Sequence, residues 1–205
     1  FPAFHPLLKA VGCELPSVAG VGIQQITTST LQMSPDPVWR GERNRTMAET
    51  DQRKPQRRPM TAPMIVARKG GIKLKMITAY DAPTARIADR AGADIILVGD
   101  SVANVVLGHD DTLAVSVDVM VHHTAAVTRT GPTALVVGDM PWLSYHSTPE
   151  ATVANAGRFI RDGGAGAVKL EGGRKRLPMI GAVLDAEIPV MGHLGLTPQS
   201  VHAMG

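Results

Sequence analysis

Aromatic residues and cysteine are both scarce in this 205-residue chain. Only 3% of the residues are aromatic, so a core must be built from aliphatic side chains and methionine. Cys13 is the only cysteine, which excludes an internal disulfide and a CxxC zinc pair and fits a reducing compartment. No run of about 18 apolar residues occurs, as a membrane-spanning helix requires. We therefore expect no membrane partner.

The charge balance is close to neutral, with a formal net charge of +3. Much of the basic surplus lies in residues 40–58, where seven Lys and Arg residues face Glu42, Glu49 and Asp51. Such a charge run is more often a solvated tail than a nucleic-acid site. We expect no nucleic-acid partner.

Composition changes near residue 60. Residues 1–59 mix short apolar pieces with Pro, Ser, Thr and Arg and show neither a strand nor a helix period. We interpret them as a disordered tail or linker. Residues 60–205 carry regular apolar runs separated by helix-like segments, so we interpret them as the catalytic domain.

Five apolar runs of strand length alternate with helical segments from Met60 onward. The runs are apolar on consecutive residues, as in strands covered on both faces, and they span residues 75–79, 94–98, 134–137, 167–170 and 188–191. Asp81, Ser116, Thr148 and Thr197 stand where helix N-caps are expected. The order predicts an α/β fold, a (β/α)8 TIM barrel truncated to about five βα units. Residues 100–115 are interpreted as a functional loop.

Acidic side chains recur where successive strands end. Asp100 follows the second strand, Asp139 the third and Glu171 the fourth, while His193 follows the fifth. Carboxyl ends of barrel strands converge on one pocket, where active sites are built. Three carboxylates in one pocket need a cation to offset their repulsion, and Mg²⁺ accepts carboxylates together with water or substrate oxygens. We therefore interpret Asp100, Asp139 and Glu171 as metal ligands, some acting through water.

Other polar groups at these strand ends are candidates for binding a substrate carboxylate. Lys169 lies two residues before Glu171, on the same side of the strand, and Ser101 follows Asp100. Each residue also has a simpler interpretation: a lone Asp after a strand is usually a helix cap, Lys169 fits an ordinary barrel ion pair, and His193 fits a structural hydrogen bond. The glycines beside the acids are interpreted as letting a ligand approach the backbone.

Five motifs in residues 60–205 resemble the ketopantoate hydroxymethyltransferase (3-methyl-2-oxobutanoate hydroxymethyltransferase) family. Each motif is weak alone, but five in order at matching intervals are specific. They are Thr78-Ala79-Tyr80-Asp81, Val98-Gly99-Asp100-Ser101, Gly138-Asp139-Met140-Pro141, Val168-Lys169-Leu170-Glu171-Gly172-Gly173 and Gly192-His193-Leu194-Gly195-Leu196-Thr197-Pro198-Gln199-Ser200.

The resemblance implies transfer of a hydroxymethyl group from 5,10-methylenetetrahydrofolate to 3-methyl-2-oxobutanoate, giving 2-dehydropantoate for pantothenate synthesis. It implies that Mg²⁺ chelates the keto acid and stabilises its enolate. On the matching positions, Asp100, Asp139 and Glu171 would hold the metal. Asp100, Ser101, Asp139 and Lys169 would contact the keto acid, and His193 would lie close to it. The family also implies a cytoplasmic homo-oligomer, typically a decamer.

The sequence departs from the family pattern in two ways. The family's general base is a glutamate from a later strand, which is expected beyond residue 205, so no catalytic base is assigned here. The stretch Gly173–Pro178 is more basic than the family pattern. We expect the 205-residue chain to be a fragment that is inactive and poorly soluble.

Two alternatives remain open from the sequence. The first is another Mg²⁺-dependent, enolate-forming barrel of the phosphoenolpyruvate mutase and isocitrate lyase type, which would need no folate. The second is an inactive barrel fragment that at most binds metal or family subunits.

Overall fold

The computed structural model describes residues 57–204. All of them belong to one structural unit, residues 53–205. The predicted tail, residues 1–59, lies outside the described residues except for its last three, so its disorder stays a prediction. No helix within residues 57–204 is long and apolar enough to cross a membrane.

Five parallel strands form one sheet in the order β1-β2-β3-β4-β5. Every predicted strand is present, with ends within two residues of the predicted bounds: β1 Met76–Thr78, β2 Ile95–Val98, β3 Leu135–Asp139, β4 Ala167–Glu171 and β5 Val190–His193. Strand order that follows chain order is typical of a β/α-barrel, whereas a doubly wound sheet reverses direction partway. The α/β class and the barrel-type order are confirmed.

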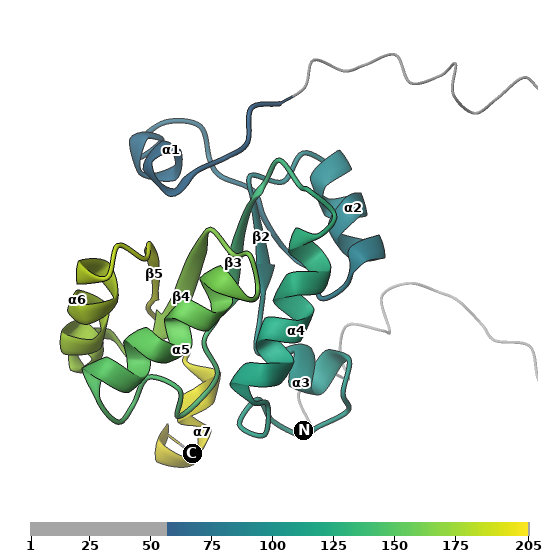
Figure 1. The fold of residues 1–205 in the computed structure, drawn as a ribbon. Helices are drawn as coiled ribbons and strands as arrows, with labels where there is room; N and C mark the ends of the chain where they lie inside the picture. Colours follow the sequence, from purple (N-terminus) through teal and green to yellow (C-terminus); the bar gives the residue numbers. More distant parts are fainter. Residues whose placement is uncertain (1–56, 205) are drawn as a thin grey trace, which may run out of the picture. The chain divides into compact units, whose positions relative to one another are not determined.

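Four helices of nine residues or more follow the first four strands: α2 Ala82–Arg90, α4 Val117–Thr128, α5 Pro149–Arg161 and α6 Leu177–Asp185. Three of the predicted caps are confirmed, because the side chains of Asp81, Ser116 and Thr148 each accept a backbone N–H from the first turn. Figure 1 shows α4 and α5 packed across the sheet, with α2 and α6 toward its two sides.

Shorter helices lie at the two ends of the strands. They are α1 Ala62–Ala67, α3 Val102–Val105, α7 Val201–Met204 and the 3₁₀ turns η3 Gly173–Arg176 and η4 Pro198–Ser200. The predicted loop after β2 therefore contains a helical turn. Thr197 stands at the N-cap of η4, so the predicted helix start is confirmed, but its side chain makes no cap bond, and its hydroxyl donates to Met204 Sδ at 3.6 Å.

The central strands β2, β3 and β4 are buried on both faces, as their consecutive apolar residues predict. Ile96, Val136 and Val168 face the helices in one core cluster. Ile95, Leu135 and Ala167 face the other way, packing with Met60 and with Met64 and Ile65 of α1 in the second cluster. The side chains of β strands alternate between faces, so each strand contributes to both clusters.

The edges of the described sheet depart from the prediction. A strand covered on both faces was expected at β1, but all three of its residues are exposed. Within the described residues β1 is an edge strand that pairs with β2 on one side. Ile87 was expected to point inward but is 60% exposed. Ala85 and Ala88, one helical turn apart, form the buried side of α2, and Ile87 is rotated away from them.

An ion-pair cluster holds the segment before β1 against the amino ends of the strands. Buried Asp94 accepts hydrogen bonds from Arg68 Nη1 at 2.9 Å, from the Lys75 N–H at 3.0 Å and from Arg57 Nη2 at 3.3 Å. Burial alone would raise the pKa of Asp94, but the Lys75 N–H and the Arg68 guanidinium outweigh it and hold that pKa below its ordinary value. The paired Asp94 carboxylate therefore links the segment before β1 to the amino ends of the strands.

Candidate active site

The register of the sheet brings four predicted site residues to one face at the carboxyl ends of the strands. Asp139 of β3 stands opposite Lys169 of β4, and Glu171 of β4 stands opposite His193 of β5. Lys169 and Glu171 are two residues apart, so their side chains point to the same side. This is the face opposite the large helices, where Val137 and Ala167 belong to the second core cluster.

A cavity of about 640 Å³ opens at this edge, and all six predicted site residues line it. They are Asp100, Ser101, Asp139, Lys169, Glu171 and His193. The long segment after β2 and the ends of β3, β4 and β5 thus converge on one hollow. The geometry is that of a ligand site formed at the carboxyl ends of barrel strands.

Asp139 is the most deeply buried of these acids, with 2% of its surface exposed. Lys169 Nζ lies 2.7 Å from its Oδ1, and the Asp100 backbone N–H donates to its Oδ2 at 3.2 Å. Burial raises the pKa of Asp139 to about 7; the Lys169 ammonium opposes that rise, and the Asp100 carboxylate adds to it. Oδ1 has two lone pairs and this one ammonium as its neighbour, so it keeps acceptor capacity for a further ligand.

Both carboxylate oxygens of Glu171 already have protein partners. Oε2 lies 3.1 Å from His193 Nδ1, and Oε1 accepts the Gln199 backbone N–H at 3.0 Å. His193 therefore has the structural hydrogen bond that its simpler interpretation requires, while it also lines the cavity. Ser101 Oγ lies 2.9 Å from Tyr80 Oη, so a residue of the first motif orients this hydroxyl.

Gln199 is a site residue that the sequence analysis missed. It was named only as part of the fifth motif and was given no role in the site, yet it is 5% exposed, and its Nε2 donates to Asp100 Oδ2 at 2.8 Å. Its place just after the fifth strand was the available signal, because that segment returns to the same edge as the acids. Tyr145, buried after β3, donates to Gln199 Oε1 at 2.6 Å and was missed as well.

The predicted role of the glycines is wrong at Gly138. A Cβ at Gly138 would collide with the Phe159 ring of α5, and one at Gly99 would come within 2.9 Å of Ser101 Oγ. At Gly172, where φ is +111°, it would meet the Arg176 side chain at 3.1 Å. Gly138 therefore makes room for the Phe159 ring rather than for a ligand. Gly99 and Gly172 each line a cavity, so the approach of a ligand to their backbone stays a prediction.

The carboxylates suit a divalent cation that is held by few protein ligands. Within residues 57–204, no three Asp, Glu, His or Cys side chains surround one point closely enough to hold an ion directly. Asp139 Oδ1, however, is buried and still has a lone pair free beside the Lys169 ammonium, and Asp100 lies next to Asp139. Mg²⁺ binds through one or two carboxylates together with water or substrate oxygens. Asp100 and Asp139 therefore fit Mg²⁺ as direct ligands, and Glu171, with both oxygens engaged, fits a water-mediated role.

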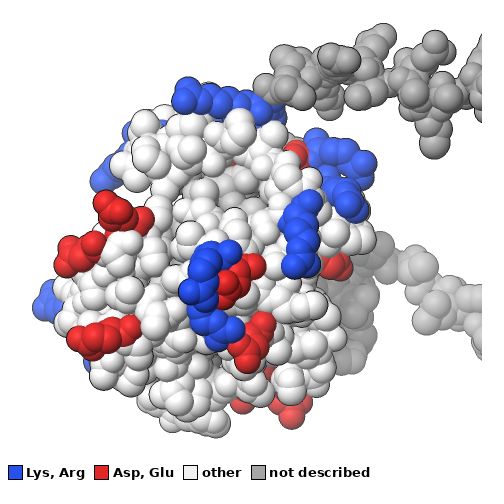
Figure 2. Space-filling model, in the orientation of Figure 1, with Lys and Arg blue, Asp and Glu red and all other residues white. Residues whose placement is uncertain are grey.

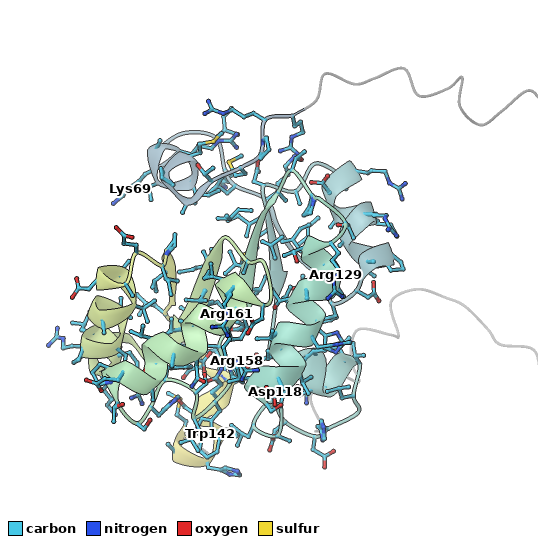
Figure 3. The ribbon with its side chains drawn as sticks, in the orientation of Figure 1. Lys69, Asp118, Arg129, Trp142, Arg158 and Arg161 are labelled. Atoms are coloured by element: carbon cyan, nitrogen blue, oxygen red, sulfur yellow. The ribbon has the colours of Figure 1, made fainter. Side chains whose placement is uncertain are left out.

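A second cavity of about 630 Å³ adjoins the first and shares His193 and Leu194 with it. Trp142, Lys175 and Arg176 line it, and none of the described residues that line it is acidic. Two members of the unusually basic stretch after β4 therefore face this cavity. Figure 3 shows Trp142 at the same end of the molecule as α7.

The outer surface of the helices carries exposed charged pairs, whereas the cavity holds a buried group of charged side chains. In Figure 2, Lys and Arg side chains are interspersed with Asp and Glu across this face. Arg158 of α5 pairs with Asp118 of α4, and both are labelled in Figure 3. Arg161 Nε lies 2.7 Å from Asp162 Oδ1. These groups are exposed, and such surface pairs contribute little to stability.

Sequence comparison gives a consistent set of relatives. The profile of the ketopantoate hydroxymethyltransferase family matches residues 59–205. The chain is 59% identical over 133 residues to the 3-methyl-2-oxobutanoate hydroxymethyltransferase of Syntrophomonas wolfei, covering 65% of this chain and 48% of the relative. It is 54% identical over 151 residues to that of Moorella thermoacetica, covering 73% and 56%. The chain spans about half the length of these relatives.

Solved structures resemble the fold at low sequence identity. A 2,3-dimethylmalate lyase of the PEP mutase/isocitrate lyase superfamily superposes with a TM-score of 0.52 at 19% identity, covering 71% of this chain and 54% of that one. A phosphonopyruvate hydrolase in complex with oxalate and Mg²⁺ gives a TM-score of 0.52 at 14% identity, covering 65% and 52%. This likeness is one of fold. The sequence match over residues 59–205 places the chain in the ketopantoate hydroxymethyltransferase family.

Proposed function

We propose that the whole protein transfers a hydroxymethyl group from 5,10-methylenetetrahydrofolate to 3-methyl-2-oxobutanoate, and that residues 60–205 supply the part of the active site that binds metal and keto acid. Family membership supports the reaction class. The observation that carries the assignment to this chain is the single cavity lined by Asp100, Asp139, Lys169 and Glu171.

Asp100 and Asp139 are the groups that would hold Mg²⁺, with Glu171 acting through water. When bound, Mg²⁺ supplies Lewis-acid polarisation of the keto group, which makes the neighbouring C–H more acidic. The charge balance of the cavity supports a cation, because Lys169 is the only ammonium facing three carboxylates there. The Mg²⁺ and oxalate in the phosphonopyruvate hydrolase of similar fold are in accord with this proposal.

The keto acid carboxylate is assigned to Lys169 and Ser101. Both line the cavity, and the Lys169 ammonium is held by Asp139 so that it stays within the pocket. The Tyr80 hydroxyl orients Ser101 Oγ from the side of the first motif. A fixed ammonium and a fixed hydroxyl pay little conformational entropy on binding, which favours one orientation of the substrate.

The adjoining cavity is assigned to the folate co-substrate. A one-carbon donor must lie next to the acceptor carbon, and this cavity shares His193 and Leu194 with the keto acid pocket. Trp142 offers an aromatic face to the pterin, and Lys175 and Arg176 offer cations to its carboxylates.

Metal titration tests the proposal on the 205-residue chain itself. We expect Mn²⁺, followed by electron paramagnetic resonance, to bind at one site and to bind more tightly when 3-methyl-2-oxobutanoate is present. Asp139→Asn removes a charged ligand and should weaken Mn²⁺ binding by at least about tenfold.

Asp118→Asn is the matched control, because it removes an equal charge from the exposed outer surface. It should leave Mn²⁺ affinity unchanged. The proposal would be wrong if Asp139→Asn bound Mn²⁺ as well as the parent chain, or if the keto acid had no effect on metal affinity.

A further inference from the structure

We propose that Gln199 is the positioning residue of this site: its amide fixes the Asp100 carboxylate, and its backbone N–H fixes Glu171, so that the two acids keep the spacing that a divalent cation needs. The inference rests on the proposed metal-binding function. It assigns a role to a residue that acts on the metal through Asp100 and Glu171 and does not bind the metal itself.

Gln199 bridges the two acids through separate groups of the same residue. Its backbone N–H donates to Glu171 Oε1 at 3.0 Å, and its side-chain Nε2 donates to Asp100 Oδ2 at 2.8 Å. Asp100 follows β2 and Glu171 ends β4, so no local backbone constraint links them. A single buried residue therefore couples two strand ends that are not neighbours in the sheet.

The orientation of the Gln199 amide is determined by its partners. The Tyr145 hydroxyl accepts the Glu171 backbone N–H at 3.3 Å, so its own proton is free to donate to Gln199 Oε1 at 2.6 Å. The Nε2 group then faces two acceptors, Asp100 Oδ2 and the Met140 carbonyl at 3.1 Å. Both hydrogens of Nε2 are used, so a flipped amide would place its oxygen against two acceptors.

This arrangement leaves one carboxylate oxygen each of Asp100 and Asp139 able to bind a metal ion in the cavity. Gln199 occupies Asp100 Oδ2, while among residues 57–204 no hydrogen bond is made to Asp100 Oδ1. Asp139 Oδ1 has the Lys169 ammonium as a neighbour and keeps a second lone pair for a metal ion. Residues that hydrogen-bond to metal ligands hold those ligands in one orientation. Removing such a residue typically weakens metal binding. Gln199 has the geometry of such a group.

The test compares Mn²⁺ affinity of the full 205-residue chain with that of three variants, using the paramagnetic resonance of free and bound Mn²⁺. Gln199→Met keeps the side-chain length but removes the donors, and it should weaken Mn²⁺ binding by about 10- to 100-fold. Tyr145→Phe keeps Gln199 but frees its amide to rotate, and it should cause a smaller loss. The thermal unfolding midpoint of each variant is measured in parallel.

Asn155→Leu is the control for a purely structural loss. Asn155 Nδ2 donates to the Ser144 carbonyl at 2.7 Å, so this change also removes a partly buried amide hydrogen bond, but at no carboxylate. It should lower the unfolding midpoint and leave Mn²⁺ affinity within about twofold of the parent. An equal loss of affinity in Asn155→Leu and Gln199→Met would overturn the inference.

The remaining outcomes separate the inference from the function on which it rests. A parent chain that binds Mn²⁺, with a Gln199→Met variant that binds it equally well, overturns the inference and leaves the metal site standing. A parent chain that binds no Mn²⁺ at millimolar concentration overturns both. Should Gln199→Met fail to fold, unchanged affinity in Tyr145→Phe overturns the inference alone.

Discussion

Asp139 carries the largest electrostatic cost among the site residues. Its carboxylate is 2% exposed, lies beside Asp100 and has one ammonium, Lys169, as a counter-charge. Burial raises its pKa to about 7, so near neutral pH about half of the metal-free chains hold this group protonated. A buried carboxylate with a raised pKa is expected in a site where a bound cation supplies the missing counter-charge.

The raised pKa of Asp139 predicts how stability depends on pH without metal. Its folded-state pKa of about 7 lies above the ordinary 3.8, so the folded chain holds this proton more tightly than the unfolded chain. The stabilisation is complete below the ordinary value and is lost as pH rises through 7, at up to about 1.4 kcal/mol per pH unit. Urea unfolding in EDTA should show this decline between pH 5 and 7, with the slope levelling off above pH 7.

Asp139→Asn should show a shallower decline, because the amide does not titrate. Asp118→Asn, an exposed acid, should keep the slope of the parent chain. Identical slopes for the parent and Asp139→Asn would show that Asp139 titrates at its ordinary pKa.

Individual site residues were predictable where they end a strand. Asp139, Lys169 and Glu171 belong to β3 and β4 themselves, so side-chain alternation fixes their direction from sequence alone. Gln199 lies in the short 3₁₀ turn η4 and Tyr145 in a turn after β3, where the direction of a side chain depends on packing that no local pattern encodes. Their hydrogen bonds to the acids could be seen only in three dimensions.

Helix α5 packs on strand β3 through a contact that requires a glycine. The Phe159 ring occupies the space where a side chain at Gly138 would stand, and Phe159 is fully buried. This close approach seats α5 against the strand that carries Asp139. The position of the helix and the position of the site residue are therefore coupled.

Two glycine substitutions should have opposite effects on stability. Gly138→Ala forces the Phe159 ring to move and should destabilise the chain by about 1–3 kcal/mol. Gly157→Ala, on α5 with nothing within 4 Å of the added carbon, should stabilise it by about 0.5–1 kcal/mol. Chemical denaturation of both variants measures this. A Gly138→Ala chain as stable as the parent would contradict the packing argument.

Elements were predictable where their signals are local. The caps Asp81, Ser116 and Thr148 mark helix starts because the capping bond joins residues three apart. Exposure at the edges was not predictable in the same way. Ile87 and the residues of β1 have apolar side chains, but their burial depends on which elements cover them, and in the described residues nothing does.

At the scale of the whole described unit, the two ends of the sheet have different roles. At the amino ends, Asp94 is paired with Arg57 and Arg68, and its charge is balanced. At the carboxyl ends, three acids share the cavity with Lys169. The fold class was predictable from the alternation of strands and helices along the sequence. The different roles of the two ends of the sheet could be seen only from the strand register and the interatomic distances in the structure.

Diffraction from crystals of the chain grown with Mn²⁺ and 3-methyl-2-oxobutanoate tests the central claim most directly, because Mn²⁺ is located by its anomalous signal. The account predicts one strong peak inside the cavity, between the carboxylates of Asp100 and Asp139, with the keto acid beside Lys169. A peak only elsewhere on the molecule, or a cavity that holds the keto acid without metal, would contradict it.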